Sequence, residues 1–192
     1  MTDWQTTAFL FPGQGSQEAG MGKDFAEQYG IARETFEEAD EILGFSLSKL
    51  CWEGSDEELS QTINTQPALY VTSIAILRVL QQELPSAKPN WVAGHSLGEL
   101  TALTASGAMS FEDGLKLVYQ RGRLMHQAGE ESPGAMAALL ALDTDKVKEI
   151  CESVSKETGE TVVLANDNCP GQVVVSGETS AIDRLLEVAT EA

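Results

Sequence analysis

Apolar residues recur at strand or helix spacing along most of the chain, and this pattern predicts its elements. Two short apolar runs bounded by proline or glycine, residues 7–11 and 89–93, are typical of buried strands. Apolar positions at helical spacing predict four helices, over residues 24–43, 64–84, 97–106 and 111–128. We expect the helix over 64–84 to be buried nearly all round, because its centre carries a single charge.

The pattern changes near residue 130, where glycine, serine and proline interrupt the periodicity. Beyond this break the pattern predicts a strand, a helix, two strands joined by a polar turn and a last helix, over residues 135–142, 145–157, 161–165 and 172–175 and after residue 177. The order β-α-β-β-α is typical of a split βαβ unit that lacks its closing strand. The last helical pattern contains no stop signal, so we expect the chain to be the front part of a longer protein.

Composition excludes several classes of function. The 192 residues include 12 Lys and Arg against 30 Asp and Glu, a net charge of −18, which disfavours nucleic acid as a partner. No apolar run approaches the ~20 residues of a membrane-spanning helix, and the start of the chain does not resemble a signal peptide. Three scattered cysteines and two histidines make a metal site improbable and favour a reducing, cytoplasmic setting.

The segment Gly94-His95-Ser96-Leu97-Gly98 matches the GxSxG pattern of a nucleophile elbow. It follows a predicted strand and opens a predicted helix, so the Ser96 hydroxyl would be exposed at a helix N-terminus. An ordinary Gly/Ser turn is the alternative interpretation. His95 is adjacent to Ser96 and should point away from it, while His126 is expected at the surface. The chain therefore contains no convincing base for this serine.

Five motifs occur in an order and at a spacing that carry a family resemblance. They are FPGQGSQ (11–17), NTQPA (64–68), GHSLGE (94–99), QRGRLM (120–125) and PGQVVVSG (170–177). With them the chain resembles the malonyl-CoA:acyl-carrier-protein transacylases of the acyltransferase family of fatty-acid and polyketide synthesis. The resemblance implies an α/β fold in which residues 1–129 form the first part of a hydrolase-like large subdomain with a parallel sheet. Residues 130–192 would form an incomplete ferredoxin-like small subdomain, with the C-terminal part missing.

The resemblance also implies a ping-pong acyl transfer with Ser96 as the nucleophile. The backbone N–H groups of Gln14 and Leu97 would hold the oxyanion, and Arg121 would bind the free carboxylate of the malonyl group. Other polar positions that match the active-site gorge of the family are Gln66, Asn166 and Asn168. The catalytic histidine of the family is expected beyond residue 192.

The implied substrates are malonyl-CoA and acyl carrier protein, with coenzyme A entering only as a thioester and no bound cofactor or metal. The glycine-rich segment after residue 11 lacks the Lys-Ser/Thr pair of a P-loop and the GxGxxG spacing, which disfavours nucleotide binding. The alternatives are a polyketide acyltransferase with another extender unit, a serine hydrolase or thioesterase, and a fragment that only docks a partner. Arg121 could also be an ordinary solvated arginine, and we expect Arg123, two positions on, to face away from the same pocket.

Overall fold

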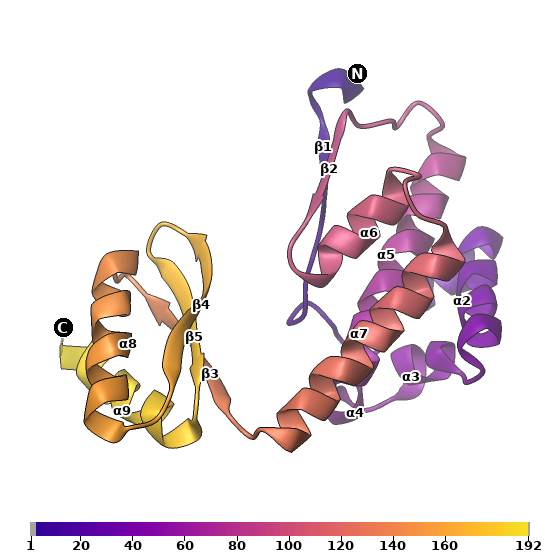
Figure 1. The fold of residues 1–192 in the computed structure, drawn as a ribbon. Coiled ribbons are helices and arrows are strands. Elements are labelled where there is room, and N and C mark those ends of the chain that lie inside the picture. The colour runs from indigo at the N-terminus through magenta and orange to yellow at the C-terminus, as the bar shows by residue number, and fades with distance from the viewer. Residues whose placement is uncertain (1–2, 192) are drawn as a thin grey trace. The chain divides into compact units, whose positions relative to one another are not determined.

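The structure, a computed structural model, describes residues 3–191, which form two compact units that divide between residues 126 and 127. Helices and strands are both present, and the predicted α/β class is confirmed (Figure 1). No helix within the described part of the chain is long and apolar enough to cross a membrane.

The first unit is built on two parallel strands, β1 (Ala8–Phe11) and β2 (Trp91–Gly94), paired from Ala8 opposite Trp91 to Phe11 opposite Gly94 (Figure 1). Both strands are short apolar runs that end at proline or glycine, as the pattern predicted, but the expectation that they are buried is wrong: Leu10 and Trp91 are exposed, and of the eight strand residues only Phe11 is buried. The remaining elements up to the unit boundary are helical: η1 (Trp4–Thr6), α1 (Lys23–Gln28), α2 (Gly30–Leu43), α3 (Leu47–Glu53), α4 (Asp56–Ser60), α5 (Thr62–Glu83), α6 (Leu97–Ala105) and α7 (Phe111–Glu131), the last of which runs past the boundary.

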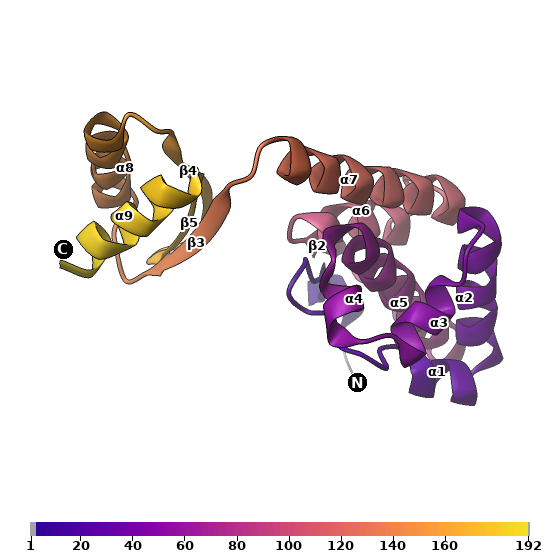
Figure 2. The same cartoon turned by 90° about the horizontal axis from the view of Figure 1, so that it is seen from below.

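Helix α5 lies at the centre of these helices, in contact with α2, α3, α4 and α6 (Figure 2). Twelve of its residues between Thr65 and Val79 are buried, which confirms the expectation that it is covered nearly all round. Pro67 is the sixth residue of α5, beyond the first turn where a missing N–H is free of cost, and it removes the one intrahelical hydrogen bond that would run to the carbonyl of Ile63. Because α5 is packed on nearly all sides, the side chains that it carries are held in place.

The helices of this unit differ from the sequence prediction in three respects. The single helix predicted over 24–43 is two helices, because Tyr29 adopts an extended conformation between α1 and α2 while its ring stacks on Phe25. Helices α3 and α4 were not predicted, since they have only seven and five residues and show little periodicity. Helix α7 continues to Glu131, beyond its predicted end at residue 128.

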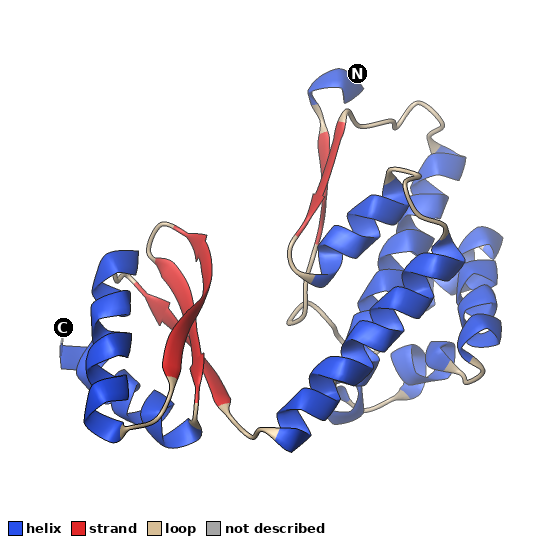
Figure 3. Cartoon of the chain, viewed as in Figure 1, coloured by secondary structure: helices blue, strands red, loops and turns tan. Residues whose placement is uncertain are grey.

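The second unit is an antiparallel sheet of β3 (Ala135–Leu140), β4 (Val162–Cys169) and β5 (Gln172–Gly177) in the order β3-β5-β4. Helices α8 (Thr144–Thr158) and α9 (Thr179–Glu191) cover one face of it (Figure 3). This order is the one that a split βαβ unit requires.

Strand β4 corrects the prediction of a polar turn over residues 166–171. Asn166 and Asn168 lie in the strand, and only Pro170 and Gly171 form the turn. Two irregularities interrupt the pairing of β4 with β5, between Leu164 and Asn166 and between Asp167 and Cys169. An edge strand with bulges accommodates polar residues, and their composition therefore misled the prediction.

Candidate active site

Ser96 sits at a strained corner between β2 and α6. Its φ and ψ angles are 53° and −111°, values that a non-glycine residue adopts only when its surroundings enforce them. The N–H of His95 donates to the carbonyl of Phe11 (3.1 Å) on one side, and the N–H of Glu99 donates to the carbonyl of Ser96 (3.2 Å) on the other. The side chain of Ser96 is exposed, as a nucleophile elbow requires.

Glycines allow three backbone segments to meet at this corner. A Cβ atom on Gly94 would lie 1.9 Å from the carbonyl carbon of Gly98, so α6 begins directly against the end of β2. A Cβ atom on Gly13 would lie 2.7 Å from the carbonyl oxygen of His95, so the segment after β1 abuts the elbow. The spacing of glycines in both motifs therefore follows from close backbone contact.

Arg121, on α7, places its guanidinium beside Ser96. Its Nη2 donates to Ser96 Oγ at 3.0 Å, and its Nη1 donates to Gln66 Oε1 at 2.6 Å. Gln66 is fully buried in α5, and its Nε2 is directed to the sulfur of Met125 at 3.2 Å. Helix α7 can approach α5 here because Gly122 has no side chain: a Cβ atom on it would lie 3.1 Å from the carbonyl oxygen of Thr62.

Arg123 does not join this group. Its Nη1 donates to Gln120 Oε1 of its own helix (3.2 Å), and the side chain is exposed. The two arginines of the QRGRLM motif thus have different environments, as their angular separation on a helix predicted.

A cavity of about 480 Å³ opens between α6 and α7 next to Ser96 and Arg121, with apolar side chains forming most of its wall. Its lining residues are Ser96, Glu99, Leu100, Leu117, Gln120, Arg121, Leu124 and Met125. A hydroxyl and a guanidinium at the side of an apolar cavity can act on an acyl group that carries an acid.

Gln14 and Leu97 are the residues whose backbone N–H groups are predicted to hold the oxyanion. Gln14 lies in the turn after β1, and its side-chain Nε2 donates to Thr62 Oγ1 at 3.3 Å. Leu97 is the first residue of α6, where backbone N–H groups have no acceptor within the helix. Their role as donors stays a prediction.

Asn166 and Asn168 belong to β4 of the second unit, where Asn166 lies opposite Val174. Their role in an active-site gorge likewise stays a prediction.

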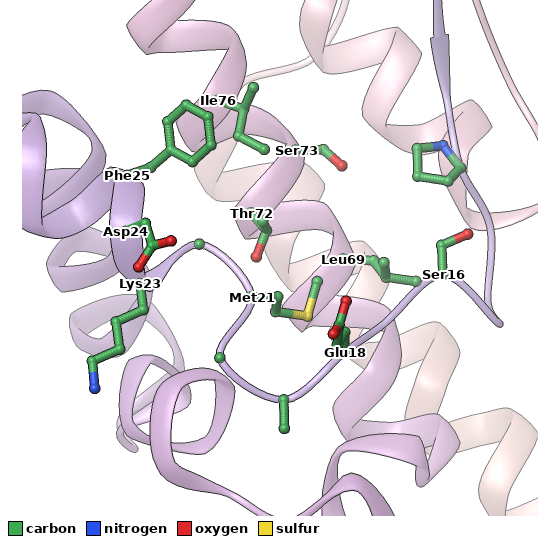
Figure 4. Close-up of a pocket in the computed structure, with 14 residues that line it drawn as sticks. Ser16, Glu18, Met21, Lys23, Asp24, Phe25, Leu69, Thr72, Ser73 and Ile76 are labelled. Atoms are coloured by element: carbon green, nitrogen blue, oxygen red, sulfur yellow. The ribbon is translucent and has the colours of Figure 1, made fainter.

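Another cavity, of about 630 Å³, lies between the glycine-rich segment after β1 and helices α1 and α5 (Figure 4). Neither Ser96 nor Arg121 lines it. The buried hydroxyl of Thr72 is part of its wall and has no hydrogen-bond partner within the described residues. Over those same residues, no group of three or more His, Cys, Asp or Glu side chains is placed to hold a metal ion.

Comparison with known proteins decides the family. Residues 8–192 match the family described as "Acyl transferase domain". The chain belongs to this acyl transferase family.

Two similar curated proteins share one name. The chain is 48% identical over 184 residues to the malonyl CoA-acyl carrier protein transacylase of Bacillus subtilis, covering 96% of the chain and 57% of that protein. It is 46% identical to the protein of the same name from Haemophilus influenzae, covering 96% and 59%. The chain thus spans rather more than half the length of the curated relatives it matches.

Solved structures also resemble this acyl transferase domain, over nearly the whole length of the chain. An acyl-carrier-protein S-malonyltransferase from Burkholderia pseudomallei superposes with a TM-score of 0.88 at 43% identity, covering 97% of this chain and 60% of that one. A structure described as a type II PKS acyl-carrier protein in complex with its malonyl-transacylase has a TM-score of 0.88 at 40% identity, covering 97% and 60%.

Sequence reasoning missed one member of the site. Met125 contacts the amide of Gln66 and lines the cavity, yet methionine in a helix carries no chemical signal of its own. Its position four residues after Arg121 places both side chains on one face of α7, and this spacing could have drawn attention to it.

Proposed function

We propose that the protein transfers a malonyl group from malonyl-CoA to the phosphopantetheine thiol of acyl carrier protein, in fatty-acid biosynthesis. The observation that carries this proposal is the 3.0 Å contact between Ser96 Oγ and Arg121 Nη2. It places a candidate nucleophile within reach of the one kind of side chain that binds a carboxylate bidentately. A malonyl thioester presents both a carbonyl carbon for Ser96 and a carboxylate for Arg121. The names of the curated relatives support the same substrates.

The proposed reaction proceeds in two acyl transfers. Ser96 Oγ attacks the thioester carbonyl, a general base takes the hydroxyl proton, the carbon–sulfur bond breaks, and the proton leaves with the thiol of coenzyme A. The thiol of the carrier protein then attacks the malonyl-serine ester, and the proton returns to Ser96. Both steps pass through an oxyanion, for which the N–H groups of Leu97 and Gln14 are the proposed donors; loss of one such donor reduces the rate ~10²–10³-fold.

The chemistry requires no bound cofactor, because the coenzyme A thioester is itself the substrate. Carrier protein is the proposed partner for the second transfer, and the structure of a carrier protein with its malonyl-transacylase supports it by similarity. We further propose a cytoplasmic location, which is compatible with three cysteines that are all free thiols.

Mass spectrometry tests the first transfer directly. The protein at its full natural length is incubated with malonyl-CoA and digested, and the peptide that contains Ser96 is examined. We expect a malonyl adduct on Ser96 that disappears when holo carrier protein is added, and no adduct in Ser96→Ala. Ser106→Ala, which removes an exposed serine at the other end of α6, should behave as wild type. An unmodified Ser96 in the wild-type protein would refute the proposal.

Arg121 distinguishes a malonyl transferase from a serine hydrolase or thioesterase built on the same elbow. A transferase selective for malonyl loses its carboxylate partner in Arg121→Ala, so malonyl transfer should fall while an acetyl donor is favoured relative to wild type. A hydrolase would release the acyl group to water and keep its donor preference. The ratio of kcat/KM for malonyl and acetyl donors, with hydrolysis measured in parallel, separates the two.

A further inference from the structure

Arg121 donates hydrogen bonds to two side chains that differ in their burial. Gln66 is fully buried, accepts the shorter bond (2.6 Å), and is itself fixed through Met125. Ser96 is exposed and accepts the longer bond (3.0 Å). Breaking the bond to Gln66 would leave a buried acceptor without a donor, whereas water can replace the arginine at Ser96. The bond to Ser96 is therefore the one that Arg121 gives up more easily.

The same bond obstructs the chemistry of Ser96. The Ser96 oxygen accepts a hydrogen from a cation, so the electron pair used in that bond is drawn away from an incoming carbonyl carbon. That carbon has to come within about 3–3.5 Å of the oxygen to react. Arg121 Nη2 already lies at 3.0 Å from it and occupies part of that approach.

A carboxylate on the acyl group can remove this obstruction. In a malonyl group one methylene separates the carboxylate from the thioester carbon. When that carbon is poised over Ser96, the carboxylate therefore reaches the guanidinium from the side of Ser96. A carboxylate carries a full negative charge and its two oxygens match the fork of a guanidinium, whereas the Ser96 hydroxyl is neutral, so the carboxylate replaces Ser96 as the partner of Nη2. Gln66 keeps Nη1 and holds the arginine nearby.

We propose that Arg121 masks Ser96 and that the carboxylate of the acyl donor unmasks it. Arg121 then contributes to donor selection twice, by binding the malonyl carboxylate and by keeping Ser96 poorly reactive toward donors that have none. This inference rests on the proposed function for the identity of the acyl group. It differs from simple carboxylate binding because it concerns the reactivity of Ser96 toward neutral electrophiles.

A neutral serine-directed reagent tests the mask without an acyl donor. The full-length protein is treated with a sulfonyl fluoride, and the rate of Ser96 modification is followed by mass spectrometry. We expect Arg121→Ala and Arg121→Met to be labelled about 10-fold faster than wild type or more, given what a hydrogen bond to a charged group is worth. Arg123→Ala removes a neighbouring charge that does not contact Ser96 and should label at the wild-type rate.

Slower labelling of the folded Arg121 variants would show that the guanidinium activates Ser96, and an unchanged rate would show that it does neither; both results overturn the mask. Arg121→Met retains the unbranched apolar stem of the side chain without its charge and decides the question if Arg121→Ala does not fold, as judged by circular dichroism. The outcome is separable from the proposed function. A malonyl adduct with unchanged labelling rates refutes the mask alone, and faster labelling without any malonyl adduct refutes the proposed function alone.

Discussion

Gly98 lies against the end of β1 so closely that a Cβ atom on it would be 2.2 Å from the carbonyl oxygen of Phe11. The neighbour is backbone and cannot rotate away. The first turn of α6, which presents Ser96, thus depends on the absence of a single methyl group.

We therefore expect Gly98→Ala to abolish acylation of Ser96 and to destabilise the first unit by on the order of 1–3 kcal/mol, because strand or helix must shift. Chemical denaturation and adduct formation measure the two effects. Gly129→Ala is the matched control: it lies within α7 with no heavy atom within 4 Å of the added Cβ, and it should stabilise the helix by up to ~1 kcal/mol. Normal acylation in Gly98→Ala would contradict the account of the elbow.

Gln66→Leu should impair recognition of the carboxylate more than the chemistry. Leucine fills the buried site, but Arg121 Nη1 loses its acceptor and the guanidinium its fixed position. A hydrogen bond to a charged group contributes about 1.5–3 kcal/mol, so we expect KM for malonyl-CoA to rise about 10-fold or more with a smaller change in kcat.

The control for this substitution is Gln127→Leu, since Gln127 is an exposed residue of α7 whose Nε2 donates to Glu131 Oε1 of its own helix. It should leave the kinetics unchanged. If Gln66→Leu weakened an acetyl donor as much as malonyl-CoA, the amide would act on the fold rather than through Arg121.

Stability should fall in alkaline solution. Burial, with a smaller effect of Asp40, raises the pKa of Cys51 from 9.0 to about 12, and burial raises the pKa of Tyr70 from 10.0 to about 12. The unfolded chain releases these protons at the ordinary values while the folded chain retains them. Their contribution to stability is therefore complete below pH 9 and is lost as the pH rises toward 12.

Urea midpoints at pH about 8 and about 10.5 measure this loss. Cys51→Ala removes one of the two titrations and should show a smaller drop between the two pH values, whereas Cys169→Ala, which removes an exposed thiol, should show the wild-type drop. Equal drops in all three proteins would contradict the contribution of Cys51 to the alkaline loss of stability.

The three thiols should differ in reactivity. Cys169 is exposed, whereas Cys51 and Cys151 are buried and desolvation raises the pKa of each. Since the thiolate is the reactive form, a disulfide reagent should modify Cys169 in the native protein and the other two only after unfolding. Peptide mapping after timed quenching identifies the modified residue, and rapid native modification of Cys51 would contradict its burial.

The sequence predicted most clearly those elements whose local chemistry and tertiary role agree. Strand β2, the elbow at Ser96 and α6 follow from apolar residues, two glycines and helical periodicity in immediate succession. Helix α4 was missed because five residues show no period, although Ser55 and Glu58 form a capping box that signals its start. The residues from Asn166 to Cys169 were predicted as a turn because bulged pairing with β5 cannot be deduced from composition.

The candidate site could be predicted as residues but not as contacts. Ser96 and Arg121 were identified from motifs, yet their hydrogen bond depends on how closely α7 packs on α5, which Gly122 permits. The orientation of the Gln66 amide depends on the sulfur of Met125, another contact between these two helices. Distances of this kind arise from tertiary packing, for which local sequence holds no period or propensity.

The buried apolar side chains form two separate clusters, one from Phe11 to Val118 and one from Leu139 to Leu185, with no residue in common. Each cluster can then unfold cooperatively by itself. Heating should produce two calorimetric events, so a single melting temperature would average unlike processes. A thermal-shift measurement on a substituted protein can therefore be interpreted only after identifying which of the two unfolding transitions the substitution affects.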